Sequence, residues 1–297
     1  MPTKIATVSV CNQVGLDKSI EYSAIAGQAC IDLSQIDAAE IGVLLNIGIY
    51  RDQNIHEPAL ASLIQGRIGL NSNLRPAHAE AWGRGTLSFD LLNGVCGFFN
   101  AVQLAASFIE TRSTRAVLVV ASDVHPSCKV QDDFPYTHLG AAALLTRSED
   151  GSGFHDVVCS SSEDDYVGSR SFTDVGKSDR ARDELTFEVD EDFSERLAEF
   201  ALTASAAYIA EHRIDVKTLK GVIVSAPPCD LRPGLTKLLG IASSQIIDTS
   251  TRFGQSFTSV PIVGYQIAVE HGLKPGDELL FLSAGAGLTF AGGLYRV

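Results

Sequence analysis

Residues Thr86–Ile109 read TLSFDLLNGVCGFFNAVQLAASFI and predict a strand, a tight turn and a helix. The residues Thr86–Asp90 favour a strand, and Asn93-Gly94 is a typical turn pair. From Cys96 onward, apolar residues recur at helical spacing on almost every side, which is typical of a buried helix. Cys96 is therefore expected in the first turn of a buried helix that directly follows a strand.

Cys96 has two interpretations at this position. Free backbone N–H groups and the positive end of the helix dipole favour a thiolate, so Cys96 would be a nucleophile on a sharp strand-to-helix turn. Alternatively, Cys96 is a small buried side chain, as free cysteines commonly are. The local pattern leaves both interpretations open.

An internal repeat around this stretch indicates the fold class. The segments SIEYSAIAGQACIDL and ERLAEFALTASAAYIAEHR each predict a helix, and each leads through Ile-Asp to a buried strand, at 43–47 and 222–225. Each copy continues with a short amphipathic helix ending in glycine, a strand–turn–helix unit and two apolar strands. Helices alternating with apolar strands predict a mixed α/β sheet covered on both faces. Two copies predict two pseudo-two-fold related α/β halves, with the functional site where they meet.

The repeat also predicts how the chain is divided. Residues 1–147 are expected to form the N-terminal half and residues 191–297 the C-terminal half, with a polar connection at 148–190. Acidic runs lie at 160–165 and 190–192. We interpret these carboxylates as solvated or helix-capping groups rather than as a metal site.

Composition excludes several classes of protein. With 297 residues, 45% hydrophobic and 20% charged, the chain is expected to be a soluble globular protein, without an apolar run long enough to span a bilayer or a signal-peptide pattern. The net charge of −13 argues against nucleic acid or an anionic membrane as the main partner. The cysteines lack CxxC pairs and zinc-ligand spacing, which predicts reduced thiols in a cytoplasm. These cysteines are Cys11, Cys30, Cys96, Cys128, Cys159 and Cys229.

Several motifs in the same order and spacing resemble the β-ketoacyl-acyl carrier protein synthase III family of the thiolase superfamily. They are FDLLNGVCGFFNAV, LVVASDVHP, YTHLGAAALL, DLRPGLTKLLGI, RFGQSFTSVP and the C-terminal LKPGDELLFLSAGAGLTFAGGLYRV. The resemblance covers nearly the whole chain. It implies a thiolase fold, with a layered α-β-α-β-α core.

The resemblance also implies the first half-reaction of that family, the loading of an acyl group onto a cysteine. In that family, the cysteine that corresponds to Cys96 accepts an acyl group from a thioester. The acyl oxygen is held by the N–H of that cysteine and by an N–H of the glycine-rich turn, here Gly285-Ala286-Gly287, with Ala286 as the expected donor. No cofactor is implied. The implied partners are an acyl carrier protein or acyl-CoA and a second subunit, in a homodimer or in a heterodimer with a complete synthase.

The second half-reaction of the family, decarboxylative condensation, uses a histidine and an asparagine that this sequence lacks. The loop Ser225–Arg232 contains no histidine, and Gln255 stands roughly where the asparagine is expected. Proline in this loop has no titrating group and donates no hydrogen bond. Ordinary condensation is therefore doubtful.

Other residues have both a functional and a structural interpretation. His138 replaces a family aspartate and is either a relocated base for Cys96 or a structural histidine. His56 falls where the family has a gating aromatic residue, and Cys229 lies on the loop that replaces the histidine loop, so each is a candidate for substrate binding. Gly254, Gly285 and Gly287 are expected to shape backbone turns beside the substrate. Arg232 matches a docking arginine and, with Lys237, would form a local basic patch for an acyl carrier protein.

Three functions follow from these residues. The first is an acyltransferase that loads an acyl group onto Cys96 and passes it to an alcohol, amine or thiol. The second is a degenerate partner subunit that pairs with a complete synthase through the strand at 87–90. The third is a condensing enzyme with substitute groups such as His138 or Gln255.

Overall fold

The computed structural model describes residues 2–71, 85–127, 134–163, 165–174 and 184–297. The helices and strands of the first half are β1 (Thr3–Cys11), α1 (Ser19–Leu33), β2 (Ile41–Asn46), α2 (Leu60–Ile68), β3 (Leu87–Asp90), α3 (Gly97–Glu110), β4 (Ala116–Ser122) and β5 (Gly140–Arg147). Those of the second half are β6 (Gly153–Ser161), β7 (Ser169–Thr173), β8 (Leu185–Val189), α4 (Phe193–Glu211), β9 (Gly221–Ser225), α5 (Arg232–Leu239), α6 (Ser250–Phe253), α7 (Val260–Glu270), β10 (Glu278–Gly285) and β11 (Thr289–Arg296). Single 3-10 turns occur at η1 (Ala38–Glu40), η2 (Asp52–Asn54), η4 (Gly94–Cys96), η5 (Ser243–Gln245) and η6 (Phe257–Ser259).

The sheet order shows the two-fold repeat. Among the described residues, nine strands form one sheet in the order β3-β2-β4-β5-β1-β6-β11-β10-β9. Ile246 makes an isolated parallel bridge to Val222 of β9 and so takes the place that β3 has beside β2. Reading outward from β1 gives β1-β5-β4-β2-β3, and reading outward from β6 gives β6-β11-β10-β9 and then Ile246. The two halves therefore have the same strand order. The α/β fold of two related halves, expected from the sequence, is confirmed.

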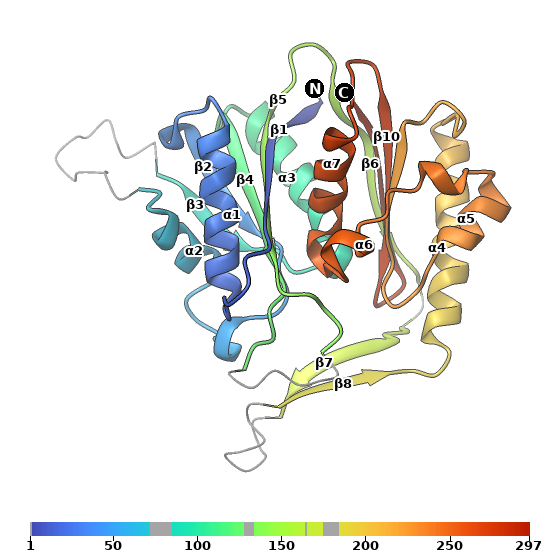
Figure 1. Cartoon of the computed structure of the whole chain (residues 1–297), viewed down its shortest axis with the longest axis horizontal. Helices are drawn as coiled ribbons and strands as arrows, with labels where there is room; N and C mark the ends of the chain where they lie inside the picture. The colour runs from blue at the N-terminus through green and yellow to red at the C-terminus, as the bar shows by residue number, and fades with distance from the viewer. Residues whose placement is uncertain (1, 72–84, 128–133, 164, 175–183) are drawn as a thin grey trace.

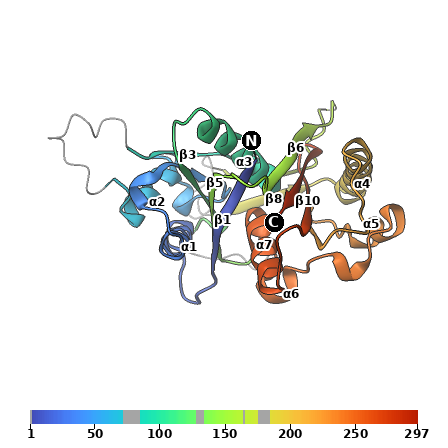
Figure 2. The same ribbon diagram turned by 90° about the horizontal axis from the view of Figure 1, so that it is seen from above.

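Three apolar clusters correspond to the layers between helices and sheet. One cluster packs α1 and α2 against the outer face of the first half, and another packs α4 and α5 against the outer face of the second half. The third contains α3 and α7 between the inner faces of both halves. Figures 1 and 2 show α1 and α2 on one side, α4 and α5 on the other, and α3 and α7 in the middle. The layered α-β-α-β-α core is thus present.

Several helices begin and end where the local sequence predicts. The helix expected from SIEYSAIAGQACIDL is α1, with Ser19 as its first and Leu33 as its last residue. α2 and α5 both end at a glycine in the left-handed conformation, Gly69 and Gly240, as the repeat predicts. None of the helices in the described ranges has the length and apolar character needed to cross a membrane.

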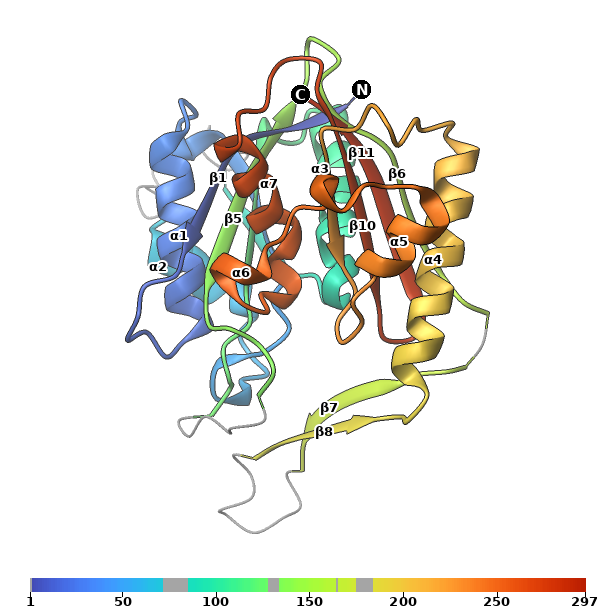
Figure 3. The same cartoon turned by 45° about the vertical axis from the view of Figure 1, so that its right-hand side comes forward.

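The segment 148–190 contains more regular structure than a polar connection. β6 lies inside the large sheet, between β1 and β11, and β7 and β8 form a separate antiparallel hairpin. Figure 3 shows this hairpin below the ends of the main sheet. β6 was not predicted because its sequence, GFHDVVCSS, mixes polar with apolar residues rather than forming an apolar run. The division of the chain into two halves at 1–147 and 191–297, joined by residues 148–190, stays a prediction.

Candidate active site

Cys96 lies where the two halves of the molecule meet. It ends the turn η4 and directly precedes α3, and only 1% of its surface is exposed. Its Sγ atom is 3.7 Å from the Thr289 carbonyl oxygen and 3.9 Å from the Ser283 carbonyl oxygen, both on strands of the second half. Cys96 also lines a cavity of about 230 Å³. The sulfur is thus buried but has a hollow beside it.

The electrostatics of Cys96 differ from the expectation of a thiolate. Burial, with a smaller contribution from nearby Cys159, raises the pKa of the Cys96 thiol to about 12. The two carbonyl oxygens accept a hydrogen bond from the S–H form and repel a thiolate. Loss of hydration therefore outweighs the helix dipole, and Cys96 is held as a neutral thiol.

Of the two expected oxyanion donors, one N–H is already hydrogen-bonded within the protein and, among the described residues, the other is not. The Cys96 N–H donates to the Asn93 carbonyl oxygen at 3.0 Å, so it closes the 3-10 turn and does not face an acyl oxygen. Gly285 ends β10, Ala286 follows it in the turn, and both line the cavity. Within the described residues, the Ala286 N–H has no backbone acceptor, whereas the Gly287 N–H donates to the Val167 carbonyl at 2.9 Å. Ala286 is thus the donor that remains available.

An aromatic wall encloses the rest of the cavity. It consists of Tyr50, Tyr136, Phe187, Phe193 and Phe257. The rings of Tyr136 and Phe257 are stacked, with centroids 4.2 Å apart. The Tyr50 hydroxyl lies 3.4 Å from the Ser171 hydroxyl, and burial raises the pKa of Tyr50 to about 12, so the wall is uncharged.

His138 does not lie in this cavity. Its Nε2 atom accepts the His125 N–H at 3.3 Å, and its ring packs 5.8 Å from that of Phe134. Burial and the neighbouring His125 lower its pKa, which keeps it neutral. Of the described residues that line the cavity, the one charged side chain is Arg170, and its Nε atom donates to a Glu188 carboxylate oxygen at 2.6 Å. A general base for Cys96 is therefore lacking among them, and a catalytic role of His138 stays a prediction without support from the cavity lining.

A second, larger cavity of about 490 Å³ adjoins the first, and Tyr136, Phe187 and Phe257 line both. Gln255 and Cys229 line this outer cavity and not the one beside Cys96. Cys229 Sγ lies 2.9 Å from the Ser194 carbonyl oxygen. The structure therefore places Gln255 and Cys229 on the approach to the inner cavity and away from the sulfur.

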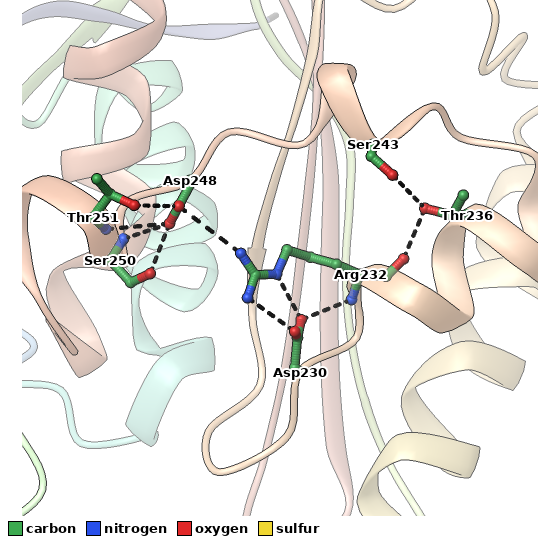
Figure 4. Close-up of polar contacts among 7 residues, drawn as sticks. All are labelled: Asp230, Arg232, Thr236, Ser243, Asp248, Ser250 and Thr251. Atoms are coloured by element: carbon green, nitrogen blue, oxygen red, sulfur yellow. Dashed lines mark hydrogen bonds and ion pairs between the residues drawn. The ribbon is translucent and has the colours of Figure 1, made fainter.

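Arg232 also lines the outer cavity, but its charge is compensated. Asp230 accepts hydrogen bonds from its Nε at 2.8 Å and from its second Nη at 2.9 Å, and Asp248 lies 3.9 Å from its first Nη (Figure 4). The hydroxyls of Ser250 and Thr251 hold Asp248 in turn. Lys237 is exposed near the end of α5. Two carboxylates around one guanidinium give no excess positive charge, so the expected basic patch is absent at Arg232.

The remaining candidates for substrate binding are His56 and Gly254, and the structure supports only Gly254 as a residue that shapes the site. His56 is exposed and lines neither cavity. Gly254 lies at φ +64° and ψ −157°, and a Cβ atom there would be 2.1 Å from the Thr137 hydroxyl. Only glycine fits this conformation and this space. Gly254 therefore allows the close approach of the turn that carries Phe257 to the segment that carries Tyr136.

Sequence reasoning missed Asp123, which is 2% exposed. Its carboxylate accepts the Ile49 N–H at 2.9 Å and the Thr258 N–H at 3.1 Å, and the Thr258 hydroxyl also donates to it. Burial raises the pKa of Asp123, while these donors act in the opposite direction. The signal was a carboxylate directly after the apolar run of β4. Asp123 joins the loop that carries Tyr50 to the turn that carries Phe257.

Comparison with known proteins agrees with this architecture. The chain is 23% identical to β-ketoacyl-[acyl-carrier-protein] synthase III of Aliarcobacter butzleri over 295 residues, which are 94% of this chain and 84% of the relative. It is 24% identical to the protein of the same name from Rickettsia prowazekii over 276 residues, which are 91% and 82% of the two chains. No protein-family profile matches the sequence.

Solved structures give the fold. The priming β-ketosynthase of the R1128 polyketide biosynthetic pathway superimposes with a TM-score of 0.80 at 17% identity and covers 99% of this chain and 96% of that one. OleA of Xanthomonas campestris, solved with lauric acid and lauroyl-CoA, gives a TM-score of 0.78 at 17% identity and covers 100% and 99%. The resemblance to synthase III and the thiolase fold are confirmed.

Proposed function

We propose that the protein is a synthase III-like acyltransferase, in which Cys96 accepts an acyl group from a thioester of an acyl carrier protein or of CoA. The observation that carries this proposal is the position of Cys96 Sγ beside a cavity of about 230 Å³, next to Gly285 and Ala286, at the junction of the two halves. The named relatives, which are synthases that act on acyl thioesters, support it.

The loading step is a thioester exchange. Cys96 Sγ forms a bond to the acyl carbon, the bond from that carbon to the donor sulfur breaks, and the proton of Cys96 leaves with the donor thiol. The Ala286 N–H is the group that would stabilise the acyl oxygen. Because burial raises the pKa of Cys96, only a very small fraction of this thiol is ionised at pH 7. Loading is therefore expected to be slow near neutrality and faster at higher pH.

Decarboxylative condensation is not part of this proposal. The described lining of the inner cavity contains no histidine, and the amide nitrogen of Asn93, its one asparagine, donates to Asn100 at 2.7 Å. Pro227 lies in the cavity wall and offers neither a proton nor a hydrogen bond. An enolate formed here would meet neither an imidazole nor an uncommitted asparagine amide among the described lining residues. The acceptor is accordingly a nucleophile that does not have to be generated by decarboxylation in the site, such as an alcohol, an amine or a thiol.

The proposal is tested by intact-protein mass spectrometry after incubation with acyl-CoA and acyl carrier protein thioesters at pH 7.5 and 9. The wild type is expected to gain one acyl mass, Cys96→Ala to gain none, and Cys229→Ala to load like the wild type. An adduct that persists in Cys96→Ala, or no adduct at either pH, would defeat it.

A partner subunit without its own catalysis is the second candidate. The raised pKa of Cys96 and its engaged N–H favour this candidate over a condensing enzyme with substitute groups. β3 is an edge strand of the sheet, and Leu87 on it is 55% exposed. Co-expression with a complete synthase tests it. A stable heteromer whose activity is unchanged by Cys96→Ala supports this role, and a homodimer that loads acyl groups by itself refutes it.

A further inference from the structure

We propose that the acyl group held beside Cys96 is aromatic, of benzoyl to cinnamoyl size, rather than a long aliphatic chain. The inference rests on the proposed acyl loading and names the substrate class of that site. It follows from the composition, the rigidity and the size of the inner cavity.

The composition of the cavity favours a flat, apolar group. Five aromatic rings, from four separate stretches of the sequence, line it together with Cys96; they belong to Tyr50, Tyr136, Phe187, Phe193 and Phe257. The Tyr50 ring lies 6.3 Å from that of Phe187 and 6.2 Å from that of Phe257. At these distances the wall rings are in contact with one another. A ring of the acyl group could pair edge-to-face or offset-stacked with the faces and edges that line the cavity, and each such pair gains about 0.5–1.5 kcal/mol beyond the burial of its area. An aliphatic chain gains only the burial.

The wall is held in place rather than left to adapt. Phe257 has φ +39°, a conformation that a bulky side chain rarely adopts. The next residue, Thr258, is fixed to Asp123 through its N–H and its hydroxyl. Strained backbone of this kind persists only where the surroundings determine it, and it is frequent at ligand sites. Phe257 is thus fixed against Tyr136 at a ring distance of 4.2 Å.

The size of the cavity limits the acyl group. An apolar cavity of about 150 Å³ accommodates benzene. The volume of about 230 Å³ beside Cys96 thus holds one ring and the short linker to the acyl carbon. The lining also carries uncharged hydroxyl groups, and its one charged side chain among the described residues, Arg170, is ion-paired. The hydroxyl groups belong to Tyr50, Tyr136, Ser169, Ser171 and Thr289. A longer aliphatic chain would have to continue into the outer cavity, whose described lining includes the charged side chains of Asp230, Arg232 and Asp248.

The test compares initial rates of Cys96 acylation by benzoyl-, cinnamoyl-, acetyl- and octanoyl-CoA. Each rate is divided by the rate of the same thioester with free glutathione, since aryl thioesters are intrinsically less reactive. We expect the normalised rate for the aryl donors to exceed that for octanoyl-CoA at least tenfold. If octanoyl-CoA or acetyl-CoA loads as well as the aryl donors, the inference is wrong although the proposed function stands.

A binding measurement separates the two proposals when no donor acylates the protein. Calorimetry on Cys96→Ala is expected to show tighter binding of cinnamoyl-CoA than of octanoyl-CoA, by about tenfold. Phe257→Leu is expected to abolish this preference, whereas Phe172→Leu, which changes a ring on β7 that does not line the cavity, leaves it intact. Equal affinities in Cys96→Ala, or a preference that survives Phe257→Leu, overturn the aromatic assignment.

Discussion

At the scale of single residues, Cys96 decides what the site can do. Its sulfur faces two carbonyl oxygens, and burial raises its pKa to about 12. A raised pKa means that the thiolate fraction increases tenfold per pH unit throughout the range below about 12. We therefore predict that the rate of Cys96 alkylation by iodoacetamide rises about tenfold per unit between pH 7.5 and 9.5. Peptide mass spectrometry measures the rate at this residue alone.

The alkylation profile has a clear alternative outcome. If the helix terminus lowered the pKa of Cys96 as the sequence suggests, the rate would level off within this pH range. Cys229, which is half-exposed and lies in the outer cavity, provides an internal reference in the same digest. A plateau at Cys96 would mean that the acylation chemistry works at neutral pH without a base.

Gly254 is the residue whose backbone the site depends on most. Alanine there combines an unfavourable φ of +64° with a Cβ atom 2.1 Å from the Thr137 hydroxyl, and we expect Gly254→Ala to lower the free energy of unfolding by about 3 kcal/mol. Gly272 has φ +83° but no atom within 4 Å of its Cβ position. Gly272→Ala therefore measures the backbone strain alone, about 1 kcal/mol. Equal losses in urea titrations of the two variants would contradict the steric account.

At the scale of elements, Asp123 joins the ends of β2 and β4 to the turn η6. Asparagine would keep one acceptor oxygen but direct amide hydrogens at backbone donors, which leaves buried N–H groups unsatisfied. We expect Asp123→Asn to lower the free energy of unfolding by about 2–4 kcal/mol and to reduce acyl loading on Cys96 as the wall loosens. Asp17→Asn, at an exposed carboxylate, is the matched control and should change stability by less than about 0.5 kcal/mol. If Asp123→Asn has normal stability and normal acyl loading, Asp123 does not hold the loop of Tyr50 and the turn η6 together.

The sequence predicts elements well where their stability is local. α1 and the glycine-terminated helices α2 and α5 follow from periodicity and capping, because these signals act within a few residues. β6 and the β7–β8 hairpin were not foreseen, because pairing with β11 and packing beneath the main sheet are decided by contacts far away in the chain. The aromatic wall was not predicted for the same reason: its five rings come from four separate stretches of the chain.

At the scale of the whole molecule, the repeat in the sequence predicts the layered fold and the position of Cys96, since both follow from two copies of one pattern. It does not predict the electrostatics, because the pKa of Cys96 depends on β10 and β11 of the other half. At Arg232, by contrast, the sequence neighbour Asp230 provides the main compensating charge, and Asp248 of the same half lies 3.9 Å away. The chemistry of the Cys96 sulfur, unlike that of Arg232, is therefore decided by contacts between the halves.

The central layer makes one cooperative unit of the two halves. Phe99 of α3 is fully buried, and its ring lies 6.4 Å from that of Phe281 on β10. We predict that Phe99→Ala lowers the free energy of unfolding by about 3–5 kcal/mol, in a single transition, because the cavity it leaves borders both halves. Hydrogen exchange should show equal loss of protection in β2 and in β9, whereas the control Leu238→Ala, 60% exposed, leaves both unchanged. Faster exchange confined to the first half would mean that the halves unfold independently, and the site between them would then open without global unfolding.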